Sequence, residues 1–200
     1  ARHDPWAPAV AEPLGVDAAT RTLWQAEARG QPLVQAWRRG DGAAGLAAVG
    51  RALARLHATD PSVLQLPDAA TRGLSHWLAE LPLRHKKIAR AAPELAGRAA
   101  AVVDTLARTA ARLPARARMP MHGDFHPEQV WLDGSRAVFF DFDEFTLGDP
   151  MEDLAQFIVK LEQLPLPPST LRAGIEALCR GYADAGGTLG GAVLAWYRSL

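Results

Sequence analysis

The residues best suited to chemistry lie in two short segments in the second half of the chain. The first runs from His122 to Gln129 with the sequence HGDFHPEQ, and the second runs from Phe139 to Asp143 with the sequence FFDFD. Between them, two apolar runs flank Asp133-Gly134, a pair typical of a tight hairpin turn. A hairpin brings its two ends together, so Gln129 and Asp141 are expected near the same edge of a small sheet.

Oxygen-bearing side chains in this arrangement suit a magnesium ion. The amide oxygen of Gln129 and the carboxylates of Asp141 and Asp143 are hard ligands, and Mg²⁺ takes a few such oxygens and leaves the rest to phosphate and water. Asp124, in the loop that leads into the hairpin, would then face a substrate hydroxyl. Phosphoryl transfer needs little more from this part of a protein than a metal clamp and a carboxylate that orients the nucleophile.

The rest of the chain is mostly helical by pattern. Residues 1–20 are rich in proline and alanine, residues 22–26 predict a strand, and residues 29–32 predict a turn. A buried stripe of Leu46, Val49, Leu53 and Leu56 predicts a helix over 43–58. Further helical patterns cover 69–91 with a break at Pro82, 95–113, the segment after Asp149, 169–185 and 190–200.

Composition excludes several classes of function. The 200 residues carry 22 Lys+Arg and 22 Asp+Glu, and 48 % are hydrophobic, as in a globular protein without an overall nucleic-acid-binding charge. No apolar run is long enough to span a membrane, and no signal peptide begins the sequence, so a cytoplasmic protein without a membrane partner is expected. The single cysteine, Cys179, lies on the apolar side of a helical pattern and is expected to pack in the core.

The segments 122–132 and 138–155, with a weaker match at Leu53–His57, resemble the family of aminoglycoside phosphotransferases and choline-kinase-like enzymes. The resemblance extends from about Leu14 to Trp196. It implies an α+β protein-kinase-like fold, with a large, mainly helical C-terminal lobe that contains the small active-site hairpin. By this likeness Asp124 is the catalytic carboxylate, Asp141 the main metal ligand and Gln129 a second ligand.

The resemblance also implies roles for other positions. Residues 1–29 would be the tail of the small lobe and the hinge, with the backbone near Glu27 and Ala28 meeting the adenine, and residues 30–200 would be the large lobe. His122 and His126 would hold the catalytic loop structurally. Independently of the family, Asp149 is explained by its position at a helix N-terminus, ahead of Pro150.

Three acidic positions keep two interpretations each. Asp143 either touches the metal or makes a structural loop contact. Glu144 and Asp153 either meet a cationic substrate or are solvated or packing carboxylates. They belong to an acidic block, 122–153, that follows a basic stretch, 84–118, whose helical face is interpreted as solvated.

The expected activity is transfer of the γ-phosphoryl group of ATP or GTP to a hydroxyl of a small molecule, such as an amino sugar, a sugar or an amino alcohol. Such an enzyme needs a glycine-rich hairpin and a strand lysine, and the first lysine of this sequence is Lys86, in a helical pattern. We therefore expect the printed chain to be a piece of a longer enzyme and inactive alone. The family most often has asparagine where this chain has Gln129. A nucleotide-binding or regulatory pseudokinase is the alternative.

Two other patterns are set aside. Gly40–Gly45 fits G-x-G-x-x-G, but without a preceding strand or a suitably placed acidic residue it is interpreted as a flexible lead into a helix. Val138–Asp143 and Gly148–Asp153 resemble motifs of haloacid-dehalogenase-type phosphatases, but the parallel-sheet domain that separates those motifs has no room here.

Overall fold

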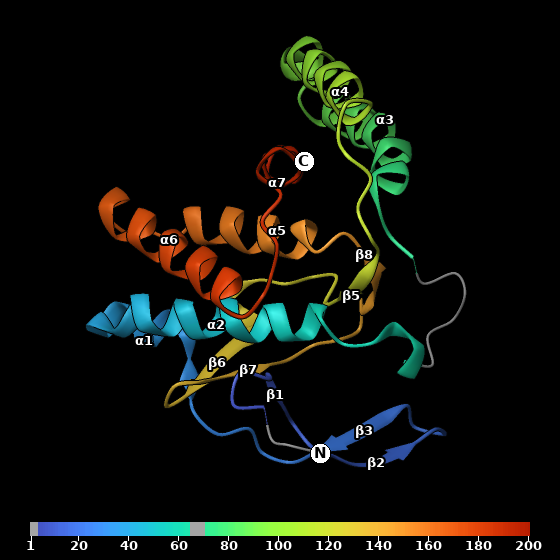
Figure 1. Cartoon of the computed structure of the whole chain (residues 1–200). Helices are drawn as coiled ribbons and strands as arrows, with labels where there is room; N and C mark the ends of the chain where they lie inside the picture. The colour runs from blue at the N-terminus through green and yellow to red at the C-terminus, as the bar shows by residue number, and fades with distance from the viewer. Residues whose placement is uncertain (1–3, 65–70) are drawn as a thin grey trace.

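The computed structural model describes residues 4–64 and 71–200. Short strands occupy the N-terminal part and the middle of the chain, and helices make up most of the remainder (Figure 1). Within the described residues, no helix is both long enough and apolar enough to cross a membrane.

The predicted hairpin is confirmed and forms the centre of a four-stranded sheet. Strands β6 (Val130–Asp133) and β7 (Arg136–Phe139) pair antiparallel, with Asp133 opposite Arg136. β1 (Ala9–Val10) adds parallel to β7, and β4 (Gln31–Pro32) adds antiparallel to β6. The prediction of a turn at 29–32 missed β4, because a strand of two residues has no alternation to detect.

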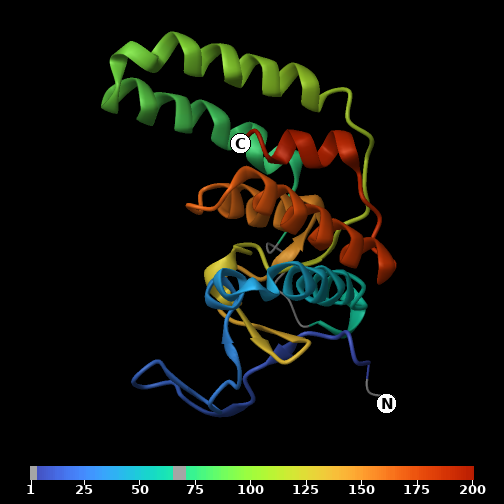
Figure 2. The same ribbon diagram turned by 90° about the vertical axis from the view of Figure 1, so that its left-hand side faces the viewer.

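A second hairpin lies near the N-terminus. β2 (Pro13–Asp17) and β3 (Thr22–Gln25) pair antiparallel, so the strand predicted at 22–26 is confirmed, whereas β2 was missed among the prolines and alanines. Its side chains Leu14 and Val16 are exposed. In Figures 1 and 2 this hairpin lies at the end of the molecule opposite to the pair α3 and α4.

The helix predicted at 43–58 begins earlier than expected. α1 (Leu33–Ala36) continues through a π-helical turn, Trp37–Asp41, directly into α2 (Gly42–His57). The interpretation of Gly40–Gly45 as a flexible lead is therefore wrong, since the backbone there is helical. The π turn places the Trp37 ring so close to Gly42 that a Cβ at Gly42 would overlap it.

The hydrophobic core lies between α2 and three later helices, α5 (Met151–Glu162), α6 (Pro168–Asp184) and α7 (Gly191–Tyr197). α2 and α6 pack closely because glycine replaces side chains at their contact, Gly50 against Leu178 and Gly181 against Ala47. The predictions of helices over 169–185 and 190–200 are confirmed to within a few residues, and Cys179 packs against this core as expected.

α3 (Leu74–Ala91) and α4 (Ala96–Ala110) form a long helical pair that extends from the body of the molecule (Figure 2). The predicted break at Pro82 is wrong. The helix continues through Pro82, whose ring is exposed, so the ring disturbs no core packing. Residues 69 and 70 of the predicted region lie outside the described residues.

A two-stranded sheet connects this pair to the site. β5 (Met119–Met121) pairs antiparallel with β8 (Thr146–Gly148), with Pro120 opposite Leu147. β5 leads directly into the loop that begins at His122, and β8 leads into α5 through Asp149 and Pro150. The pairing therefore places the loop at 122–129 beside the first turns of α5.

Candidate active site

One buried carboxylate holds the backbone of the loop that begins at His122. Asp153 of α5 accepts hydrogen bonds from the backbone N–H groups of His122, at 2.8 Å, and Gly123, at 2.9 Å. Its carboxylate is also 3.1 Å from Nε2 of His57. Asp153 is 0 % exposed. Of its two interpretations, the structure favours the packing one, because its oxygens face the protein interior.

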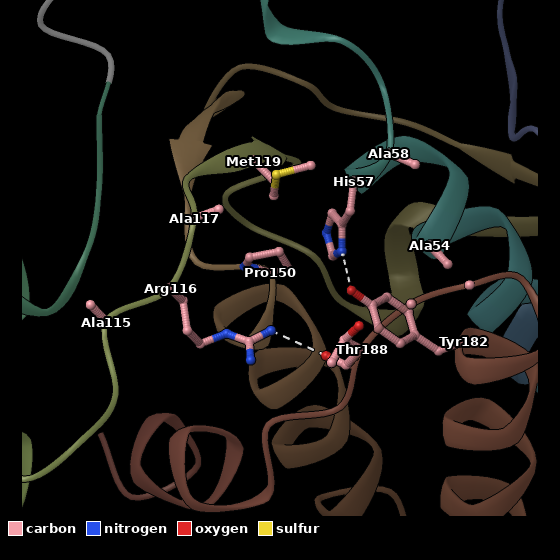
Figure 3. Close-up of a pocket in the computed structure, with 12 residues that line it drawn as sticks. Ala54, His57, Ala58, Ala115, Arg116, Ala117, Met119, Pro150, Tyr182 and Thr188 are labelled. Carbon is pink, nitrogen blue, oxygen red and sulfur yellow. Dashed lines mark hydrogen bonds between the residues drawn. The ribbon is translucent and has the colours of Figure 1, made fainter.

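His57 links this carboxylate to Tyr182 of α6. Its Nδ1 is 2.9 Å from the Tyr182 hydroxyl oxygen, and burial raises the pKa of that hydroxyl above its usual range. His57 and Tyr182 line a cavity of about 380 Å³, whose wall also includes Arg116 and Thr188 (Figure 3). Asp153 and His57 thus connect the wall of this cavity to the backbone of the loop at 122–129.

The ring of His122 is buried and packs between the rings of Phe125 and Phe142. Its Nε2 lies 2.7 Å from the carbonyl oxygen of Phe140, so the ring spans the loop and the segment after the hairpin. This placement is consistent with the structural role expected for His122. His126 has its Nε2 3.8 Å from a carboxylate oxygen of Asp124.

Asp124 differs from Asp153 in facing a cavity. Its side chain is 46 % exposed, and one carboxylate oxygen accepts a hydrogen bond from Nε2 of Gln156. The cavity that it lines has a volume of about 580 Å³ and is called here the Asp124 cavity. Its wall also contains Arg72, Trp77 and Glu152. A carboxylate oriented by neighbours yet open on one side is the arrangement that general-base or hydroxyl-orienting chemistry requires.

Gln129 and Asp141 lie together, as the hairpin predicted. Nε2 of Gln129 donates to a carboxylate oxygen of Asp141 at 3.2 Å, and the N–H of Phe140 donates to the backbone carbonyl of Gln129 at 3.0 Å. Asp141 has φ = 61°, a conformation uncommon for residues other than glycine and frequent at functional sites.

The donor set at this pair fits a magnesium ion. Oε1 of Gln129 is buried and has no hydrogen-bond partner among the described residues, which is costly unless something else binds that oxygen. It lies on the side chain that contacts the Asp141 carboxylate, and amide and carboxylate oxygens are magnesium ligands. No cluster of three or more His, Cys, Asp or Glu suited to a metal occurs in the described part of the chain.

Asp143 and Glu144 follow in the turn before β8. Both side chains are exposed and line a shallow cavity with Arg72 and His76. Glu144 Oε2 accepts from Nη2 of Arg72 at 2.7 Å. Within the described residues, no hydrogen bond joins Asp143 to the Gln129–Asp141 pair.

The remaining predicted residues lie apart from the Asp124 cavity. Glu27 and Ala28 occupy the connection between β3 and β4 and are exposed and half-buried, respectively. Asp149 accepts from the N–H of Met151 at 3.0 Å and from Nε of Arg116 at 3.1 Å. It thereby satisfies a free N–H at the start of α5, as expected from its sequence position.

Sequence reasoning did not identify Gln156 and Arg72 as residues of the cavity. Gln156 is three residues after Asp153, so both lie on one face of α5, and this spacing could have identified it. Arg72 gave no such signal. Its Nη1 donates to the carbonyl of Gly123 at 2.8 Å and to Oε1 of Glu152 at 3.2 Å, and these partners are 51 and 80 residues away in sequence.

Glu152 is almost fully buried in the wall of the cavity. Burial raises the pKa of this carboxyl to about 7, although the hydrogen bond from Nε1 of Trp77, at 2.8 Å, and the charge of Arg72 act in the opposite direction. The sequence indicated only that Glu152 belongs to the first turn of a helix.

Comparison with known proteins gives one family and many structural relatives. Residues 1–187 match the family described as phosphotransferase enzyme family. Aminoglycoside-3'-phosphotransferase of type VIII has 23 % identity and a TM-score of 0.59, over 96 % of this chain and 72 % of that protein. No curated protein is similar enough in sequence to match.

Two further solved structures extend the range of relatives. Glucosamine kinase, in complex with glucosamine, ADP and inorganic phosphate, has 18 % identity and a TM-score of 0.60, over 87 % of this chain and 55 % of the enzyme. A choline/ethanolamine kinase family protein from Mesorhizobium loti has 20 % identity and a TM-score of 0.60, over 94 % of this chain and 61 % of that protein. The chain thus spans little more than half the length of some relatives. The fold is protein-kinase-like, and the chain belongs to the phosphotransferase enzyme family.

Proposed function

We propose that the full-length protein transfers the γ-phosphoryl group of ATP or GTP to a hydroxyl of a small molecule. The observation that carries this proposal is that one loop, residues 122–129, contains both an open carboxylate, Asp124, and a buried amide oxygen, Gln129 Oε1, that has no hydrogen-bond partner among the described residues. Family membership supports phosphotransfer, and the ADP in the glucosamine kinase complex supports a nucleoside triphosphate donor.

Asp124 orients the acceptor. An acceptor in the Asp124 cavity donates its hydroxyl hydrogen to the open carboxylate oxygen, while Gln156 holds the other oxygen. As the bond from the acceptor oxygen to phosphorus forms, the bond from phosphorus to the β,γ-bridging oxygen breaks, and the acceptor proton passes to Asp124. The loop keeps its shape during this step because Asp153 binds two of its backbone N–H groups.

Gln129 and Asp141 would hold the magnesium ion, and Asp143 stays a candidate third ligand. Bound there, the ion would neutralise phosphate charge as it builds up. In the chain itself, the Gln129 NH₂ group donates to the Asp141 carboxylate. Binding of the ion by both oxygens would therefore require the amide to turn so that Oε1 faces the same side as the carboxylate.

The family resemblance supports the remaining assignments. We propose that residues 1–29 belong to the small lobe and hinge, with the backbone at Glu27 and Ala28 near the adenine, and that residues 30–200 form the large lobe. A nucleotide-dependent kinase of this kind is proposed to work in the cytoplasm.

A pair of substitutions in the full-length protein tests the roles. Asp124→Asn keeps the side-chain shape but accepts protons poorly, so turnover should fall by about a hundredfold or more with nucleotide affinity nearly unchanged. Asp141→Ala should instead weaken binding of the magnesium–nucleotide complex. Turnover of Asp124→Asn within a few-fold of wild type would contradict the first role, and unchanged nucleotide affinity in Asp141→Ala would contradict the second.

The alternative is a nucleotide-binding pseudokinase. The hydrogen bond from Gln129 Nε2 to Asp141 favours it, since this pair satisfies part of its own hydrogen bonding without a metal. An assay of nucleotide hydrolysis and transfer by the full-length protein separates the two functions. Magnesium–nucleotide binding without either reaction would support the pseudokinase.

A further inference from the structure

Both acidic and basic side chains line the Asp124 cavity. Three acidic residues line it, Asp124, Glu144 and Glu152, and among the described residues four basic ones do so as well: Arg72, Arg84, Lys160 and Arg198. The sequence placed the acidic residues in one block, which could have received a cationic substrate. The fold brings basic side chains to this block from α3, from α5, from the segment ahead of α3 and from the end of α7.

Arg72 pairs with both glutamates. Its Nη2 donates to Glu144 Oε2 at 2.7 Å, its Nη1 donates to Glu152 Oε1 at 3.2 Å, and its side chain is only 17 % exposed. The second oxygen of Glu152 accepts from Nε1 of Trp77 at 2.8 Å. Both oxygens of Glu152 and one of Glu144 therefore already have donors from the protein.

An acceptor that carries an ammonium group would find little free negative charge beside these residues. It would have to displace Arg72, whose Nη1 also binds the carbonyl of Gly123, directly before Asp124. Displacement would separate a partly buried guanidinium from its partners and free the loop backbone at the catalytic position. Without displacement, the ammonium group would lie near like charges, which disfavours its binding at a desolvated contact.

We infer that Arg72 is a specificity-determining residue: it occupies the acidic part of the Asp124 cavity as a built-in cation, so that the cavity takes uncharged polyhydroxyl acceptors in preference to their amino counterparts. This inference rests on the proposed function, in that the Asp124 cavity is taken as the acceptor site. Hydroxyl groups can share the remaining donors and acceptors of the cavity without displacing a charge.

Three matched sugars test the inference on the full-length protein: glucose, glucosamine, and N-acetylglucosamine, which keeps the nitrogen substituent but has no charge. Ligand-observed NMR titration at a pH where the glucosamine amine is protonated gives the three affinities without requiring turnover. We expect both uncharged sugars to bind wild type more tightly than glucosamine. Arg72→Gln, which frees the carboxylates, should shift the glucose-to-glucosamine affinity ratio by about tenfold toward glucosamine.

Three further variants sharpen the test. Arg84→Gln removes an equal charge from the same cavity, but Arg84 stacks on Trp77 and pairs with neither glutamate, so the ratio should shift much less. Arg72→Lys keeps the charge and should keep the wild-type preference. Arg72→Gln could be too unstable to fold, because the buried Glu152 carboxylate loses its ion-pair partner. The double variant Arg72→Gln/Glu152→Gln then removes this unpaired charge and still leaves Glu144 without Arg72.

Several results would overturn the inference. They are tighter binding of glucosamine by wild type, no binding of the uncharged sugars, an unchanged ratio in the Arg72→Gln variants, and an equal shift in Arg84→Gln. Phosphoryl transfer is measured separately on the same sugars. Absence of transfer with the binding preference intact would refute the proposed function and leave the assignment of Arg72 supported.

Discussion

Replacement of Asp153 by asparagine tests how the loop at 122–129 is held. The carboxylate accepts from His122 N and His57 Nε2 on Oδ2 and from Gly123 N on Oδ1. Asparagine has one oxygen and one NH₂ group, so one of these backbone N–H groups must face another donor. The less costly orientation keeps the oxygen toward His122 and turns the NH₂ group toward Gly123.

The cost follows from this geometry. One buried backbone donor loses its acceptor, which costs about 1–3 kcal/mol, and the other two hydrogen bonds lose the assistance of a charge. We therefore expect Asp153→Asn to lower the free energy of unfolding by about 3 kcal/mol. We also expect the amide of Gly123 to exchange with solvent much faster, because in the variant no acceptor protects it.

Urea unfolding measures the first effect, and hydrogen exchange of the peptide that contains Gly123 measures the second. Asp133→Asn is the matched control, since Asp133 is exposed at the end of β6 and should change neither quantity. A loss below about 1 kcal/mol in Asp153→Asn, together with unchanged exchange at Gly123, would refute the role given to Asp153.

Two further predictions concern stability. The folded-state pKa of Glu152 is raised from 4.5 to about 7, so the folded protein binds more protons than the unfolded chain between these values, and stability should fall by about 3 kcal/mol as pH rises from about 4.5 through 7. Urea unfolding across this range should show that Glu152→Gln removes this decrease in stability. If stability depended on pH in the same way in the variant and in wild type, the raised pKa of Glu152 would be contradicted. Gly50→Ala would place a Cβ against the Leu178 carbonyl and 2.7 Å from Tyr182 N, and should destabilise the contact of α2 with α6 by about 3 kcal/mol. Gly97→Ala has open space on α4 and should be neutral or stabilise by up to about 1 kcal/mol, so similar melting temperatures for the two alanine variants would count against this packing.

Local features of the site could be predicted from the sequence. The hairpin at Asp133-Gly134 depends on neighbouring residues, and it alone brings Gln129 to Asp141 across twelve positions. The capping contact of Asp149 with Met151 is equally local. The helices with a clear apolar stripe were also found, because the period of the stripe is a property of the sequence.

Features that depend on distant segments could not be predicted. Asp153 and His57 are 96 positions apart, and the pattern of neither segment shows that they meet in the core. Likewise, the acidic block seemed free to bind a cation until the fold placed Arg72 against Glu144 and Glu152. The sequence determined which residues can bind a metal or move a proton. Only the tertiary structure decided which carboxylates are paired and which, such as Asp124, stay open, since pairing depends on burial and on partners from other elements.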